Sequence, residues 1–118
     1  MTTREFYEKI GEDYDEVLRR FGSDEIVSRF VLKFEKDGSF PSLDGTLKKG
    51  DVENAFCFAH TLKGIALNLG LKKLGALSGE VTTLLRSKDL EKAVAAFPAL
   101  KEEYESVVFC IASLKIEE

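Results

Sequence analysis

Cysteine and proline are scarce in this sequence, and long apolar runs are missing from it. The chain has two cysteines and two prolines among 118 residues. Cys57 and Cys110 form no CxxC pair and have no histidines clustered around them. We therefore expect buried or half-buried free thiols, with a disulfide or a metal site as the less favoured alternatives. No stretch approaches the roughly 20 apolar residues that span a bilayer, and the first residues lack the apolar region of a signal peptide. These absences predict a cytoplasmic protein that does not contact membranes.

The sequence also lacks the parts of an enzyme that uses ATP by itself. It contains no P-loop and no glycine-rich nucleotide-binding box, and it is too short to hold an ATP-binding domain beside another domain. A net charge of −4 argues against binding to nucleic acid, because phosphates would repel the chain. With one histidine and no Glu-x-x-His pair, the chain offers too few ligands for a metal or haem bundle. We therefore expect no metal and no cofactor.

Helical periodicity extends over nearly the whole chain. Apolar residues recur at spacings of three and four, whereas the alternation typical of strands is scarce. Ser23, Asp51 and Asp89 are suitable N-caps, and glycines follow several of the expected helices. The pattern predicts these helical segments: Glu5–Ile10, Tyr14–Phe21, Asp24–Lys36, Pro41–Lys49, Val52–Leu69, Leu71–Arg86 and Leu90–Leu114.

The predicted architecture is an all-α, antiparallel, up-down four-helix bundle. Its members are the helices that begin near residues 24, 51, 71 and 90, because these are long and joined by short loops. We expect one domain over 1–118, with accessory N-terminal helices in 1–22 and the bundle in 23–114. The accessory helices and the 41–49 segment would cover its ends and sides. Pro98 predicts a kink in the last helix, with two shorter helices joined near Phe97 as the alternative.

His60 lies on the side of its helix opposite the core. At about 100° per residue, the apolar residues of the helix gather on one broad face: Ala55, Phe58, Ala59, Leu62, Ile65, Ala66 and Leu69. His60 points the other way, so it should be accessible to solvent. Lys63 places a cation beside the imidazole. Gly64 is unfavourable within a helix by about 1 kcal/mol relative to alanine, which indicates that space is needed there.

The run from His60 to Gly64, followed by Asn68-Leu69-Gly70, resembles the signature of HPt domains, the histidine phosphotransfer modules of multistep phosphorelays. The expected order of helices from Tyr14 to Leu114 is similar to that family too. The resemblance implies that His60 accepts a phosphoryl group through the ring nitrogen remote from the backbone. It implies that Lys63 stabilises this group and that Gly64 clears space for the partner. The partners implied are response-regulator receiver domains and hybrid sensor kinases, with Mg²⁺ supplied by the receiver.

One departure from the family pattern concerns the helix after His60. Many members have a glutamine there that bonds to the phosphoryl group, and this chain contains no glutamine. Thr82 or Thr83 could replace it through a hydroxyl, and Arg86 could add a second cation. Gly75 and Gly79 indicate either close approach of another helix or an opening beside His60.

For partner docking the sequence points to apolar residues near His60. These are Phe56, Leu67 and Leu71, with Ile10 or Tyr14 from the N-terminal segments. We expect a monomer that carries phosphate and does not act as an enzyme. Two alternatives stay open: a phosphoacceptor and dimerisation fragment of a sensor kinase, and a non-catalytic helical adaptor. The kinase fragment is disfavoured because Thr61, not an acidic residue, follows His60.

Overall fold

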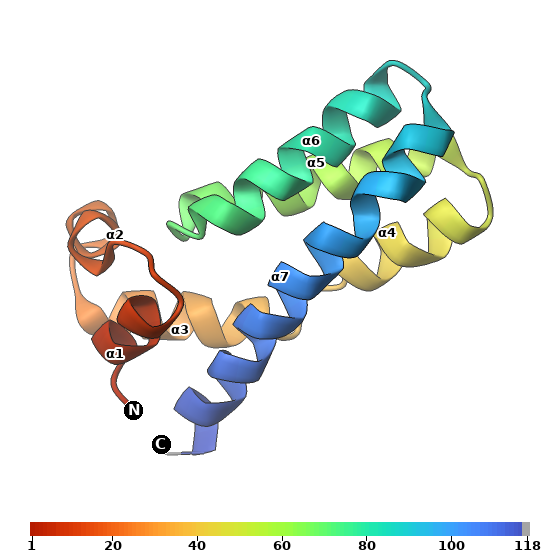
Figure 1. Cartoon of the computed structure of the whole chain (residues 1–118). Helices are drawn as coiled ribbons and strands as arrows, with labels where there is room; N and C mark the ends of the chain where they lie inside the picture. The colour runs from red at the N-terminus through yellow and green to blue at the C-terminus, as the bar shows by residue number, and fades with distance from the viewer. Residues whose placement is uncertain (117–118) are drawn as a thin grey trace.

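Seven α-helices and no strand make up the computed structural model over residues 1–116, the part of the chain that the structure describes (Figure 1). No helix in this range is both long enough and apolar enough to cross a bilayer. The predicted all-α fold is confirmed. The helices are α1 (Thr3–Lys9), α2 (Tyr14–Phe21), α3 (Asp24–Phe34), α4 (Ser39–Lys48), α5 (Val52–Asn68), α6 (Lys72–Arg86) and α7 (Leu90–Ile116).

The helices begin where the sequence supplies capping side chains. The Ser23 hydroxyl accepts a hydrogen bond from the backbone N–H of Ile26 at 3.2 Å. The carboxylate of Asp51 accepts one from the N–H of Asn54 at 3.3 Å, and Asp89 caps α7 in the same way. Each of these bonds satisfies a backbone donor that the first turn of a helix leaves unpaired. All seven helices lie within two residues of their predicted bounds, although the N-cap residues of α4 and α6 make no side-chain hydrogen bond.

The bundle is built from α4, α5, α6 and α7. α5 and α6 form an antiparallel hairpin, α4 packs along α5, and α7 packs along α6 (Figure 1). The prediction that the 41–49 segment only covers the bundle is therefore wrong. Phe40, Leu43 and Leu47 recur every three or four residues and are buried, which gives α4 a core-facing stripe. The Phe40 ring also stacks on Tyr104 of α7, with 4.0 Å between the ring centroids.

α3 does not run beside the hairpin as expected. It packs mainly against α2, with further contacts to α1 and α7, and Figure 1 shows it preceding α4 along the lower side of the molecule. The break between them is local: the side chain of Asp37 accepts a hydrogen bond from the N–H of Ser39 at 2.9 Å and starts α4 anew. α7, by contrast, continues through Pro98 as one helix, so the alternative of two helices is wrong.

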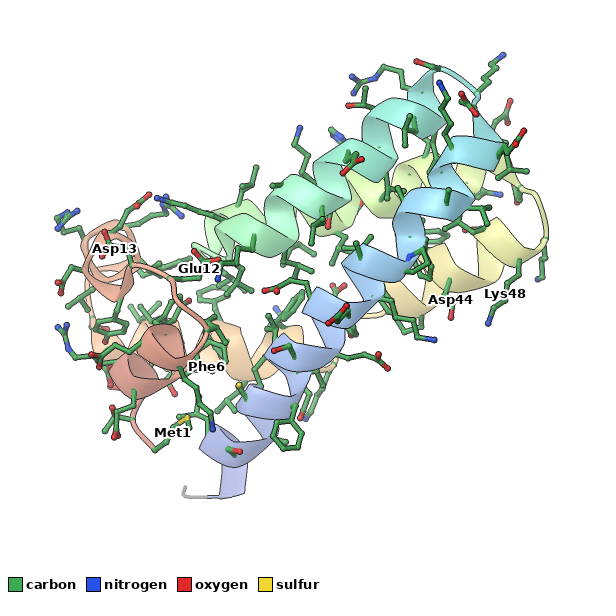
Figure 2. All side chains as sticks on the ribbon, in the orientation of Figure 1. Met1, Phe6, Glu12, Asp13, Asp44 and Lys48 are labelled. Carbon is green, nitrogen blue, oxygen red and sulfur yellow. The ribbon has the colours of Figure 1, made fainter. Side chains whose placement is uncertain are left out.

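The two N-terminal helices cover the end of the hairpin where α5 turns into α6. Tyr7 of α1 is buried, and its hydroxyl donates to the carbonyl of Leu69 at 2.6 Å. Burial raises the pKa of Tyr7 far above its usual value, which keeps this donor protonated. Glu12, labelled in Figure 2, accepts a hydrogen bond from the backbone N–H of Lys73 at 3.0 Å and so caps the start of α6. Arg20 of α2 donates to the carbonyls of Leu67 and Asn68.

Candidate functional site

His60 is exposed on the outer face of α5, as the periodicity predicted. The opposite face of the helix fills the core, where Ala55, Ala59, Leu62 and Ala66 are fully buried. These four residues follow one another at spacings of three and four, which keeps them on one side of the helix. Position 60 is out of step with that spacing, so its side chain points to the other side. The imidazole is therefore available to another molecule without any movement of the core.

Phe56, one turn before His60, holds the histidine ring from one side. The two rings stack with 5.9 Å between their centroids and 15° between their planes. Phe56 is half-buried, so it is itself restrained by packing. On α6, the guanidinium carbon of Arg86 lies 5.4 Å from the centroid of the Phe56 ring. This cation–π contact places Arg86 one ring away from His60 and adds a positive charge to the site.

Lys63 follows His60 by one turn and lies across Gly79 of α6. A Cβ atom built on Gly79 would stand 3.5 Å from both Cδ and Cε of Lys63. The half-buried lysine stem therefore lies over this glycine, and its Nζ is 3.9 Å from the same Cβ position.

Gly75 has the same relation to Leu67, because a Cβ there would come within 2.5 Å of Cδ2 of Leu67. Close approach of α5 therefore explains Gly75, whereas the contact at Gly79 is of ordinary van der Waals length. Gly64, by contrast, faces open space: a Cβ built on it would meet no atom within 4 Å. The sequence expectation that this glycine leaves room beside His60 agrees with the geometry.

Three of the predicted docking residues are placed where they cannot meet a partner. Leu71 has 1% of its surface exposed, Tyr14 5% and Ile10 8%. The docking prediction is wrong for them, because the turn after α5 and the two N-terminal helices are packed together and bury these side chains. Leu67 is 43% exposed and Phe56 is half-buried beside His60, so these two do face the surface near the histidine.

The two threonines that could replace the missing glutamine differ in their surroundings. Thr82 is buried, and its hydroxyl donates to the carbonyl of Ser78 at 2.7 Å. Thr82 is therefore wrong as a ligand for a phosphoryl group, because its donor is already used inside the core. Thr83 is exposed on α6. Adjacent residues of a helix point about 100° apart, so the spacing of Thr82 from Ser78 and Leu85, four and three residues away, could have placed it on the core side.

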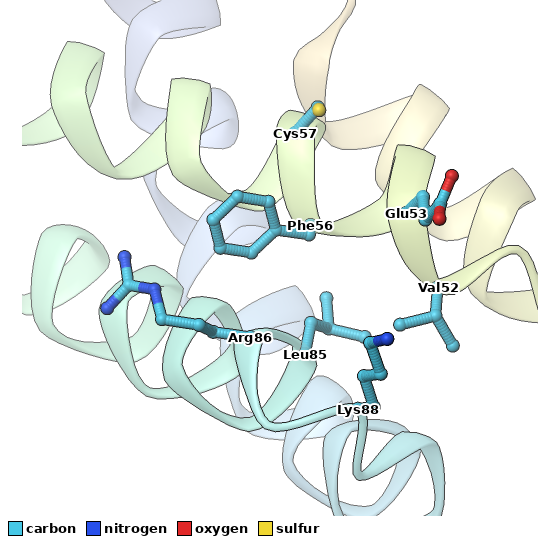
Figure 3. Close-up of a pocket in the computed structure, with 7 residues that line it drawn as sticks. All are labelled: Val52, Glu53, Phe56, Cys57, Leu85, Arg86 and Lys88. Carbon is cyan, nitrogen blue, oxygen red and sulfur yellow. The ribbon is translucent and has the colours of Figure 1, made fainter.

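A cavity of about 330 Å³ adjoins the histidine face, between the start of α5 and the end of α6 (Figure 3). We call it the Lys88 pocket. This pocket was not predicted from the sequence. The expectation of a buried or half-buried thiol is wrong for Cys57, which is exposed and lines the pocket. The lining residues are Val52, Glu53, Phe56, Cys57, Leu85, Arg86 and Lys88.

The site combines an exposed imidazole, a lysine one helix turn after it, an arginine on the ring that stacks on it, and open space at Gly64. A family model described as "Hpt domain" matches residues 26–108, from α3 to the second half of α7, and includes the whole segment from His60 to Gly70. The chain belongs to the Hpt domain family. Within this family match, α5 and α6 of the Hpt domain carry every residue that we place around the histidine.

The Hpt domain is also similar to a curated protein from Dictyostelium discoideum, "Phosphorelay intermediate protein rdeA". The two are 26% identical over 113 residues, which is 96% of this chain and 43% of the relative. The chain thus spans less than half of the length of that protein. The match includes α1 and α2, which lie outside the family model. No solved structure matches the chain significantly.

Proposed function

We propose that this Hpt domain carries a phosphoryl group on His60 between receiver-domain aspartates in a two-component phosphorelay. The observation that carries the proposal is the exposure of the chain's single histidine on α5, within the segment that the Hpt family model covers. Lys63 and Gly64 supply charge and space beside it. The relative's name, which describes a phosphorelay intermediate, supports the same role.

The reaction needs little covalent help from the protein. The unprotonated nitrogen of the neutral imidazole attacks the phosphorus of an aspartyl phosphate. A nitrogen–phosphorus bond forms while the phosphorus–oxygen bond breaks, and its electron pair leaves with the aspartate carboxylate. The second ring nitrogen keeps its proton. The reverse step delivers the phosphoryl group to another aspartate. Such transfers depend on in-line positioning and on neutralisation of charge.

Each residue around His60 has a part in this scheme. Phe56 restrains the ring, Lys63 and Arg86 face the negative charge of the phosphoryl group, and Gly64 lets the donor approach. Mg²⁺ belongs to the receiver in this proposal, because Mg²⁺ is held by carboxylates and phosphate oxygens. The domain acts as a carrier and not as a kinase. Its partners are receiver domains and hybrid sensor kinases, which it meets as a monomer in the cytoplasm.

The decisive experiment compares the wild type with His60→Gln. Both proteins are incubated with a phosphorylated receiver domain and Mg²⁺, and bound phosphate is measured before and after acid treatment. We expect acid-labile phosphate on the wild type alone, because the amide of a glutamine side chain offers no nucleophilic nitrogen. Absence of transfer from a broad panel of receivers to a folded wild type would contradict the proposal, as would equal labelling of His60→Gln.

Lys63 is tested by the rate of the same transfer. We expect Lys63→Ala to slow it about ten-fold, less than the loss seen for enclosed oxyanion sites because this site is open to solvent. Lys101→Ala, on the exposed side of α7, is the matched control and should leave the rate unchanged. An unchanged rate in Lys63→Ala would remove its proposed role and leave that of His60 in place.

A further inference from the structure

The turn between α6 and α7 differs from the turns that follow α1, α2, α4 and α5, each of which has a glycine in the left-handed conformation. Over residues 1–116, five residues have a left-handed backbone, and four of them are glycines: Gly11, Gly22, Gly50 and Gly70. The fifth is Lys88, with φ of 58°. Glycine is favoured in this conformation because any Cβ crowds the backbone there. Lys88 is the exception that needs a reason.

The hydrogen bonds of the turn do not supply that reason. The N–H of Lys88 donates to the carbonyl of Leu85, and the N–H of Asp89 donates to that of Leu84, both at 2.9 Å. The turn at Gly70 has the same two bonds, in which Gly70 and the next residue reach back to Leu67 and Ala66. This is the usual glycine-ended helix terminus. The lysine therefore contributes through its side chain.

The side chain of Lys88 lines the pocket named after it. Figure 3 shows Val52 and Phe56 on the α5 side and Leu85 on the α6 side, so much of the wall is apolar. Lys88 and Arg86 supply two cations from the α6 side, and Glu53 supplies a carboxylate from α5. Phe56 belongs both to this wall and to the ring stack on His60. A molecule seated in the pocket would thus contact Phe56, the ring that stacks on His60.

We propose that the Lys88 pocket is a docking subsite for the receiver domain, and that it takes an acidic side chain next to an apolar one. The proposal rests on the proposed function of His60. A domain that presents an aspartyl phosphate with Mg²⁺ must gather carboxylates around that ion. Its surface around the reacting phosphate is therefore acidic, and Lys88 with Arg86 is complementary to it.

The negative net charge of the chain increases the selectivity of the positive charge at Lys88 and Arg86. The protein has a net charge of −4, so the molecule as a whole repels an acidic partner while Lys88 and Arg86 attract it locally. Glu53 restricts how the partner's acidic side chain can bind. It repels a carboxylate on the α5 side of the pocket, so the carboxylate binds on the α6 side. The apolar wall then buries a neighbouring side chain of the partner, while His60 stays free to react.

Lys88→Gly separates this role from a structural one. Glycine relieves the backbone conformation, so the melting temperature should rise by roughly 3 °C. The concentration of phosphorylated receiver that gives half-maximal transfer should nevertheless rise about three- to five-fold, with the maximal rate unchanged. A purely structural lysine would give the rise in melting temperature alone. Lys88→Glu should increase the half-maximal concentration on the order of ten-fold, and low salt should enlarge the difference.

Lys101→Glu is the control, since it makes the same change in charge on the exposed side of α7. It should shift the half-maximal concentration less than two-fold. Transfer by Lys88→Gly and Lys88→Glu within two-fold of the wild type would overturn the docking subsite while leaving phosphotransfer through His60 intact. Absence of transfer to the wild type from every receiver would overturn both proposals.

Discussion

The two ends of the α5–α6 hairpin are built in opposite ways. At the turn from α5 to α6, which we call the closed end, Tyr7, Glu12 and Arg20 bond to the hairpin backbone, and Gly70 fits against Val17. At the other end, the open end, α5 begins and α6 finishes around the Lys88 pocket, with Cys57 and Arg86 exposed. His60 lies on the outer face between the two.

The closed end therefore stabilises the hairpin, whereas the open end is available for binding a partner. The closed end satisfies its backbone groups with side chains from α1, α2 and the turn between them, and so holds the register of the two helices that position His60 and Lys63. The open end leaves side chains free to meet a partner. A carrier must bind a donor, release it and then bind an acceptor, so its contact surface should be accessible and moderate in strength. We expect changes at the closed end to alter stability and changes at the open end to alter transfer.

Gly70→Ala should be the most damaging change at the closed end. Gly70 has φ of 72°, and a Cβ there would overlap Cγ2 of Val17. We expect the free energy of unfolding to fall by about 3 kcal/mol, from backbone strain and overpacking together. Urea unfolding followed by circular dichroism measures it.

Gly50→Ala is the matched control at the turn from α4 to α5. Its φ is 71°, but a Cβ there would stand 3.6 Å from Cδ2 of Leu90, which is an ordinary contact. We expect a loss of about 1 kcal/mol from the backbone alone. Equal losses in the two variants would show that packing against Val17 does not distinguish the closed end.

Tyr7→Phe should have the next largest effect. It removes the hydroxyl that donates to Leu69 and leaves a buried carbonyl without that partner. We expect the free energy of unfolding to fall by about 2 kcal/mol, while the rate of phosphotransfer at a temperature where both proteins are folded stays the same. Chemical denaturation and the transfer assay measure the two quantities.

Tyr104→Phe serves as its control, because Tyr104 is only half-buried and its ring stacks on Phe40 in either form. Its stability should change by less than about 0.5 kcal/mol. A slower transfer in Tyr7→Phe would contradict the separation between the two ends, since it would show that the closed end also controls the chemistry.

Gly79 tests the middle of the hairpin and should give the smallest change in stability. Alanine there meets the Lys63 stem at 3.5 Å, which is normal contact. We expect Gly79→Ala to stabilise the protein by up to about 1 kcal/mol through helix propensity and to leave transfer unchanged. Gly79→Leu should keep the helix but displace Lys63, and so slow transfer toward the rate of Lys63→Ala.

A double-mutant cycle tests whether the effect of Gly79→Leu on transfer depends on Lys63. If Gly79 acts through Lys63, Gly79→Leu should add nothing to the loss already caused by Lys63→Ala. Additive losses would show instead that the leucine disturbs His60 or the approach of the partner directly. Melting temperatures of all three variants control for a general loss of structure.

Helices and the histidine face could be predicted from the sequence because both depend on local patterns. Caps and apolar spacing define each helix within two residues, and the position of His60 against the core stripe of its own helix is a local property. Lys63 and Gly64 lie three and four residues after His60 on the same helix, so sequence spacing alone suggested them, and their roles stay predictions.

The predictions from the sequence are wrong where the burial of a residue depends on another helix that packs over it. Leu71, Ile10 and Tyr14 are apolar and near the right helices, but the packing of α1 and α2 on the closed end buries them. α4 is short, which suggested a cover, although its stripe reaches the core. Lys88 carried one signal that could have been used: it occupies a helix end of the kind that this sequence otherwise fills with glycine.

The two thiols differ in burial, so one of them can be labelled selectively in the folded domain. Cys57 is exposed one turn before His60 and lines the Lys88 pocket, whereas Cys110 is buried in the core. A thiol-reactive fluorophore should therefore attach to the folded protein at one position, without any engineered cysteine. Its emission would respond to a receiver that enters the pocket, so docking could be followed in real time and separately from the chemistry at the neighbouring imidazole.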